Sequence, residues 1–332
     1  MEAARMTVGV LLINTGTPDE PTVEAIRPYL TEFLMDPAII GAPYFVRKPL
    51  VKHIVSSRPE KNVERYRAFW TPEGSPFMLT SRAQQRALAD DLGSEFAVEL
   101  AMRYGNPGIR PGLEALRDAG CSTVVVVPLY PQNVNVCAGT CFKEARAQLA
   151  ALAREGWRPE VREVPSFCDQ PAYRRALAES VARAWQPEPG AKLLVSFHST
   201  MLRDIKRDPT YLDQATRTRD RLAADLGISA DDAVLCFQSR FDNRKWLSPF
   251  TEHVLRDLAR RGTRDVCVVC PGFVADNLET SVEVNAELRE AFMQEAVAAG
   301  ADAAQVRFTY VPALGTSPGL IEALSCAVKE VL

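Results

Sequence analysis

Histidine is scarce in this chain, and the marks of several large function classes are missing. Only three histidines occur among 332 residues. No G-x-G-x-x-G or Walker pattern is present, so a nucleotide is not expected. The net charge of −3 gives no strong field that would attract a nucleic acid. The longest apolar run, Val124–Tyr130, is far shorter than the roughly 20 residues of a membrane-spanning helix.

The amino terminus also lacks the features of a secretory signal. No long apolar core is followed by a small-residue cleavage site, and we interpret Val8–Ile13 as a buried strand. The pattern therefore predicts a cytoplasmic protein. Its composition, with 47% apolar and 24% charged residues, is ordinary for a globular domain.

The eight cysteines are not needed as disulfides, because a chain of this length can build its own core. Cys267 and Cys270 lie in an apolar strand, whose alternating faces point the two thiols to opposite sides. Cys137 and Cys141 follow another strand, and we expect them to be exposed. Two thiols make only half of a zinc or iron–sulfur site, so the sequence leaves a cluster open without favouring one.

The chain reads as two similar halves in which strands alternate with helices. The predicted strands are Val8–Ile13, Ala97–Tyr104, Thr123–Tyr130, Lys192–Phe197, Ala233–Gln238 and Asp265–Cys270. The predicted helices between them include Ser81–Leu92, Gly112–Ala119, Thr140–Glu155 and Pro249–Arg261. This alternation predicts two doubly wound α/β domains, each a parallel sheet with helices on both faces.

We place the first domain at residues 1–158 and the second at 159–312. Residues 313–332 should form a helix that packs back on the first domain. Ligands of doubly wound sheets bind beyond the carboxyl ends of the strands. We therefore expect a site in a cleft between the domains, built from the turns that follow the strands.

His198 directly follows an apolar strand, at the end where ligands bind. One interpretation is a strand-end histidine bonded to backbone. The other is a base, since neutral imidazole accepts a proton near pH 7. His53 and His253 lie in amphipathic helical stretches and are expected to be surface residues.

Glu279, Glu283 and Glu287 are spaced four residues apart. On a helix they fall along one face, each about 6 Å further along the axis. An exposed row would be solvated and would repel itself by only a few tenths of a kcal/mol per pair. A buried row would need protons or cations as partners, and would then form a path for protons or a divalent metal.

The segment from Gly41 to Arg58 is basic and amphipathic, with Arg47, Lys48 and Lys52 among aromatic and aliphatic residues. Such a segment suits an anionic amphiphile or a membrane surface, although a solvated helix face has the same pattern.

Seven stretches carry a resemblance that covers nearly the whole chain. They are LLINTGTPDEPTVEAIRPYLTEFLMDPAII (11–40), RPEKNVERYRAFWTPEGSPF (58–77), MRYGNPGI (102–109), VVVVPLYPQ (124–132), LLVSFHS (193–199), CFQSRFDNRKWLSPFT (236–251) and CPGFVADNLET (270–280). In these stretches, and in their order, the sequence resembles the ferrochelatase family. The resemblance implies two Rossmann-like domains of the chelatase type. It also implies a lyase that inserts Fe²⁺ into protoporphyrin IX, giving haem b and two protons in the last step of haem biosynthesis.

The resemblance assigns roles to particular residues. His198 matches the catalytic base that takes protons from the pyrrole nitrogens, and Glu279 matches its acidic partner across the porphyrin. Glu283 and Glu287 continue an acidic ladder, so these four residues are the ones expected to handle the metal. The positions that match porphyrin-lining residues are Asn14, Tyr66, Ser75, Arg103, Tyr104 and Trp246. Iron is then a substrate, porphyrin and haem are the partners, and Arg47 and Lys48 lie in a lip that could meet the inner face of the cell membrane.

Some positions depart from the family pattern. Thr200-Met201 stands where members usually have Leu-Pro or Ile-Pro, and Asn277 stands where many have His or Cys. Thr15 replaces a bulky residue, often Tyr in members acting on coproporphyrin, which favours protoporphyrin. Asn135 stands at an internal cysteine ligand of the cluster-binding members. The alternatives are a coproporphyrin III ferrochelatase, another tetrapyrrole chelatase such as one for sirohydrochlorin, and a non-catalytic porphyrin or haem carrier.

Overall fold

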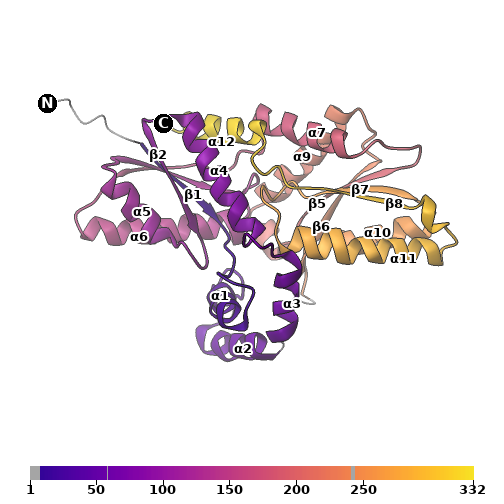
Figure 1. Ribbon diagram of the computed structural model, residues 1–332, viewed down its shortest axis with the longest axis horizontal. Helices are drawn as coiled ribbons and strands as arrows, with labels where there is room; N and C mark the ends of the chain where they lie inside the picture. Colours follow the sequence, from indigo (N-terminus) through magenta and orange to yellow (C-terminus); the bar gives the residue numbers. More distant parts are fainter. Residues whose placement is uncertain (1–7, 58, 241–243) are drawn as a thin grey trace. The chain divides into compact units, whose positions relative to one another are not determined.

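The computed structural model of the chain describes residues 8–57, 59–240 and 244–332. These residues form two compact units. The first runs to Pro165 and takes in Ile321–Leu332, and the second is Ser166–Leu320. Each unit contains one four-stranded, wholly parallel sheet flanked by helices (Figure 1). The prediction of two doubly wound parallel sheets is confirmed.

The first sheet has the strand order β2-β1-β3-β4, so the chain starts on an inner strand and winds outward in both directions. Its strands are β1 (Val8–Asn14), β2 (Phe96–Met102), β3 (Thr123–Pro128) and β4 (Glu160–Glu163). The apolar run of β1 is buried from Gly9 onward. Helix α5 (Ile109–Asp118) packs so closely on β1 that a Cβ at Gly112 would lie 2.8 Å from Leu11 Cδ1.

Helices α1 to α6 of the first unit form two groups, one packed on the sheet and one away from it (Figure 1). Helices α5 and α6 lie on one side of the sheet and α4 on the other, whereas α1, α2 and α3 lie together away from the sheet (Figure 1). Their bounds are α1 (Val23–Met35), α2 (Tyr44–Ser57), α3 (Pro59–Phe69), α4 (Pro76–Leu92), the π-helical turn η1 (Asn135–Gly139) and α6 (Thr140–Arg154).

The second sheet repeats the same winding, with the order β6-β5-β7-β8. Its strands are β5 (Lys192–His198), β6 (Ala233–Gln238), β7 (Asp265–Val269) and β8 (Arg307–Val311). One face is covered by α7 and α9, and the other by α10 and α11 (Figure 1). The helical segments of this unit are α7 (Pro171–Ala184), α8 (Leu202–Arg207), α9 (Thr210–Leu226), α10 (Thr251–Arg260), η2 (Glu279–Leu288), α11 (Arg289–Ala298) and η3 (Ala303–Gln305). Helix α12 (Pro318–Glu330) begins in this unit, and its larger part, from Ile321 onward, belongs to the first unit.

Sequence reasoning missed the fourth strand of each sheet. Strand β4 has the sequence EVRE and is mostly exposed, and β8 begins with the exposed Arg307. Neither strand forms a continuous apolar run, which is the signal that located the other strands, including β2 and β6 at the opposite edges of the two sheets. Within the described ranges, no helix combines the length and the apolarity needed to cross a bilayer.

Candidate active site

His198 ends β5, at the point where the second sheet reverses its winding. The chain leaves the sheet from β5 on one side of this point and from β7 on the other. The turn after β7 carries Phe273, whose ring lies 6.4 Å from the half-buried His198 ring at a nearly perpendicular angle. Open α/β sheets bind ligands at this reversal point, so His198 is placed where the sequence predicted.

The imidazole of His198 is held in one tautomer. Its Nδ1 lies 2.7 Å from the carbonyl oxygen of Ser199. Because a carbonyl oxygen only accepts, Nδ1 must carry the proton, and in the neutral ring Nε2 then carries the basic lone pair. The backbone is held as well, since Tyr211 donates its hydroxyl to the His198 carbonyl at 2.8 Å. This backbone contact is the one that the first interpretation of His198 expects, and the role of a base stays a prediction.

The three glutamates of the acidic row lie on η2, a π-helix and not the ordinary helix that their spacing suggested. Glu279 and Glu283 are half-buried, whereas Glu287 is exposed. In a π-helix the backbone bonds run from i to i+5, so side chains four residues apart fall just short of one turn and stay close to one face. The row thus runs from a shielded end to solvent.

Glu283 is held by two hydrogen bonds from Ser239. Its two oxygens accept from the backbone N–H of Ser239 at 2.9 Å and from the Ser239 hydroxyl at 2.5 Å. Burial raises the pKa of Glu283, and the charge of Glu279 raises it further, while the Ser239 bonds and His198 lower it. The pKa of Glu283 therefore depends on the charges of both Glu279 and His198.

Trp246 is buried and closes the loop that follows His198. It forms an antiparallel bridge with Met201, and Leu247 donates its N–H to the Thr200 carbonyl at 2.8 Å. Thr200-Met201 is therefore fastened to the neighbouring segment by backbone bonds.

In the first unit, Asn14 ends β1 and is almost fully buried. Its Nδ2 donates to Ser81 at 3.1 Å and its Oδ1 accepts from the Thr15 N–H at 3.0 Å. Ser75 is also buried and donates to Thr17 Oγ1 at 3.2 Å. These polar groups line the carboxyl end of the first sheet, where each already has a protein partner.

Arg103 and Tyr104 follow β2 and share one acidic partner that sequence reasoning missed. Arg103 forms an ion pair with the buried Asp36, and Tyr104 donates its hydroxyl to the same carboxylate at 3.1 Å. The Arg103 guanidinium lies 4.4 Å from the centre of the Tyr104 ring, and burial raises the pKa of that tyrosine. Asp36 thus fixes the turn after β2. Tyr66, another predicted lining residue, is buried edge-on against Tyr29.

The predicted lip is only partly basic at its surface. Arg47 is buried and donates to the carbonyls of Ile40 and Ala42 at 3.2 and 2.8 Å, so it closes the loop before α2 instead of facing solvent. Arg58 lies outside the described residues. The exposed face of α2 consists of apolar side chains beside Lys48 and Lys52.

The described residues contain no group of three or more His, Cys, Asp or Glu side chains placed to hold a metal together. The four residues expected to handle the metal are therefore not a closed ligand cage, because Glu287 is exposed while Glu279 is half-buried at the far end of the row. The expected exposure of Cys141 is wrong, because this residue lies in the first turn of α6 and is fully buried, whereas Cys137 is half-buried. None of the eight cysteines, all of which lie in described residues, forms a disulfide, and Cys267 and Cys270 are buried.

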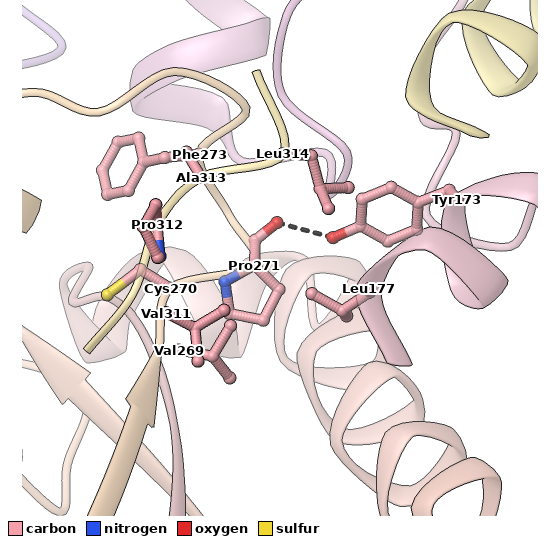
Figure 2. A pocket seen from close by; sticks show the side chains of 10 residues that line it. All are labelled: Tyr173, Leu177, Val269, Cys270, Pro271, Phe273, Val311, Pro312, Ala313 and Leu314. Atoms are coloured by element: carbon pink, nitrogen blue, oxygen red, sulfur yellow. Dashed lines mark hydrogen bonds between the residues drawn. The ribbon is translucent and has the colours of Figure 1, made fainter. Parts of the chain in front are cut away.

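A small cavity lies behind Phe273, between the carboxyl ends of β7 and β8 and helix α7 (Figure 2). Its volume is about 10 Å³, the room of roughly one water molecule. Tyr173 donates to the Pro271 carbonyl at 2.6 Å across its wall. A macrocycle cannot enter a space of this size, so this cavity is not a tetrapyrrole pocket.

Comparison with known proteins decides the family. The family model described as Ferrochelatase matches residues 7–332. The chain belongs to the ferrochelatase family. The ferrochelatase of Bordetella pertussis is 43% identical over 334 residues, which covers 98% of this chain and 88% of that one. Ferrochelatase 1 of Shewanella oneidensis, another member of the ferrochelatase family, is 38% identical over 328 residues, covering 97% and 95%.

Solved structures support the fold of this ferrochelatase family member. The sirohydrochlorin chelatase SirB of Bacillus subtilis subspecies spizizenii, in complex with cobalt, has a TM-score of 0.57 at 14% identity, covering 98% of this chain and 95% of its own. DR2241 of Deinococcus radiodurans, whose structure resembles chelatases, has a TM-score of 0.54 at 12% identity and is covered over 55% of its length. At such identity the likeness concerns the chelatase fold alone.

Proposed function

We propose that the protein is a ferrochelatase that inserts Fe²⁺ into protoporphyrin IX, yielding haem b and two protons in the last step of haem biosynthesis. One observation carries this proposal: His198, whose Nδ1 is bonded to the Ser199 carbonyl, ends β5 at the ligand-binding end of the second sheet, and its charge lowers the pKa of Glu283 in the acidic row. The family match over residues 7–332 supports the choice of reaction.

The chemistry requires a base and a route for charge. Free-base porphyrin carries protons on two inner nitrogens, and the metal enters only when the ring is bent and these protons leave. A rigid site that favours the bent ring is complementary to the transition state. His198 would accept the protons at Nε2. Glu279 would face the ring, and Glu283 and Glu287 would carry protons or pass the ferrous substrate, since carboxylate oxygens suit hard cations.

The remaining predicted residues would hold the ring in two ways. Trp246, Tyr66, Asn14 and Ser75 would line the porphyrin site. Arg103 and Tyr104 are both engaged by Asp36, so we propose that they act by shaping the turn after β2.

We favour protoporphyrin over coproporphyrin because Thr15, whose hydroxyl contacts the Tyr130 hydroxyl, adds little bulk beside Asn14. The deciding experiment is anaerobic turnover of protoporphyrin IX, coproporphyrin III and sirohydrochlorin with Fe²⁺, each followed by its absorption spectrum. Haem formation from protoporphyrin at the highest kcat/KM supports the proposal. A preference for another ring would replace the substrate, and tight binding of every ring without metallation would identify a carrier.

We further propose that the protein works in the cytoplasm, with α2 touching the anionic inner face of the cell membrane. The support is an exposed apolar row on this helix, in which Phe45 is 76% and Tyr44 59% accessible, with Lys48 and Lys52 on the same helix. A basic amphipathic helix of this kind binds anionic lipid surfaces.

A further inference from the structure

Ser239 has a backbone conformation that does not suit a serine. Its φ is +64°, and among the residues that the structure describes it is the one non-glycine residue with positive φ. Residues with a Cβ avoid this region, whereas glycine enters it freely. A serine at this position therefore needs a compensating contact that glycine could not make.

That contact is the bond from the Ser239 hydroxyl to Glu283. The backbone N–H of Ser239 donates to one carboxylate oxygen at 2.9 Å, and the hydroxyl donates to the other at 2.5 Å. A glycine would keep the first bond and lose the second. Because both oxygens are held, the carboxylate of Glu283 is restricted in rotation as well as in position.

The backbone on which Ser239 stands is itself fixed. The side chain of the preceding residue, Gln238, accepts from the buried Ser196, which lies 2.7 Å from the Thr251 hydroxyl. The Gln238 carbonyl accepts from the N–H of Ser199 at 2.8 Å, directly after His198. The turn carrying Ser239 is thus bonded to the turn carrying the proposed base.

We propose that Ser239 is a positioning residue, whose hydroxyl orients the Glu283 carboxylate beside Glu279 and His198 for handling the ferrous substrate. This inference rests on the proposed function. Ser239 touches neither the iron nor the ring in this role. It acts through Glu283, in the way that groups bonded to metal-binding carboxylates tune metal affinity and activity.

The test compares Ser239→Gly and Ser239→Ala with wild type, with separate KM values for Fe²⁺ and porphyrin. Ser229→Gly is the matched control, because this exposed serine also uses its hydroxyl in a turn of the second unit. We expect kcat/KM for Fe²⁺ to fall about tenfold to one hundredfold in both Ser239 variants, with the porphyrin KM unchanged. Ser239→Gly should unfold at the same temperature as wild type or higher, because it relieves the backbone conformation.

The glycine variant separates the two possible roles of Ser239. A purely structural serine predicts that Ser239→Gly is as active as wild type, and that result would overturn the inference. On a Glu283→Ala background, Ser239→Gly should cause no further loss, and an additive loss would also contradict it. If wild type binds porphyrin but never metallates it, the proposed function fails and the inference fails with it. If wild type and Ser239→Gly are equally active, the proposed function stands and only the inference fails.

Discussion

Asn14 and His198 hold the same place in the two sheets. Each is the last residue of the strand from which its sheet winds outward, and each is the last residue in register with the neighbouring strand, opposite Met102 and Gln238 respectively. The amide of Asn14 is buried and donates to Ser81, whereas the His198 ring is half-buried with a basic Nε2. An amide does not accept a proton near neutral pH, so only the second unit carries a base at this place.

Replacement of His198 by alanine should remove that base. We expect turnover to fall by about one hundredfold to ten-thousandfold, the usual contribution of a positioned general base, while porphyrin binding persists. Loss of porphyrin fluorescence under anaerobic conditions measures the rate. His253→Ala is the matched control, because His253 is exposed on α10. Wild-type turnover in His198→Ala would remove this histidine from the mechanism.

Removal of the Asp36 carboxylate should lower the free energy of unfolding more than removal of an exposed carboxylate. Asp36→Ala leaves the Arg103 guanidinium, whose side chain is only 13% exposed, without its ion-pair partner, and we expect a loss of unfolding free energy that approaches the cost of a broken buried pair, about 3–5 kcal/mol. Denaturant unfolding measures this loss. Glu160→Ala, which breaks the exposed pair with Arg162, should cost less than about 1 kcal/mol. Equal effects of the two substitutions would show that Asp36 has no special structural role.

Alkaline pH should destabilise the fold through its buried thiols. Burial raises the pKa of all six buried cysteines, and that of Cys236 reaches about 12 against an ordinary value of 9.0. A raised pKa in the folded state stabilises the fold below pH 9, and this stabilisation is lost as the pH rises above 9, because only the unfolded chain can then ionise freely.

Melting temperatures between pH 8 and pH 11 test this expectation, with Cys236→Ala expected to melt with a weaker pH dependence than wild type. In the native protein at pH 8, iodoacetamide should modify the half-exposed Cys137 and Cys326 before the six buried thiols. Equal labelling of Cys236 by mass spectrometry would contradict its burial.

The apolar face of α2 should control membrane binding. Phe45→Glu with Leu50→Glu replaces two exposed apolar side chains by charges that anionic lipid repels. We expect wild type to sediment with phosphatidylglycerol-containing vesicles at low salt and to be released by high salt, and the double variant to stay in solution. Leu79→Glu, an exposed site on α4, should behave as wild type. Absence of wild-type binding at low salt would refute the membrane proposal.

The sequence alone was enough to place the inner strands and His198. Strands such as β1 and β5 are buried on both faces, so their apolar runs are visible without a structure, and His198 follows its run directly. Strands β4 and β8 were missed, because their sequences EVRE and RFTYV are too short and too polar to form continuous apolar runs. Arg47 and Arg103 were expected to face a membrane and a ligand, but Arg47 bonds to backbone carbonyls and Arg103 to Asp36. The type of a side chain does not show which carbonyls and carboxylates the fold brings near it.

Local pattern thus determined the fold class, the winding of two parallel sheets and the acidic row, because these depend on burial and spacing along one segment. Only the tertiary structure decided the π-helical form of η2, the tautomer of His198 and the bond from Ser239 to Glu283. The Ser239 contact joins residues separated by 44 positions in the chain. Such pairs are created when strands and helices pack, and no periodicity within a single segment encodes them.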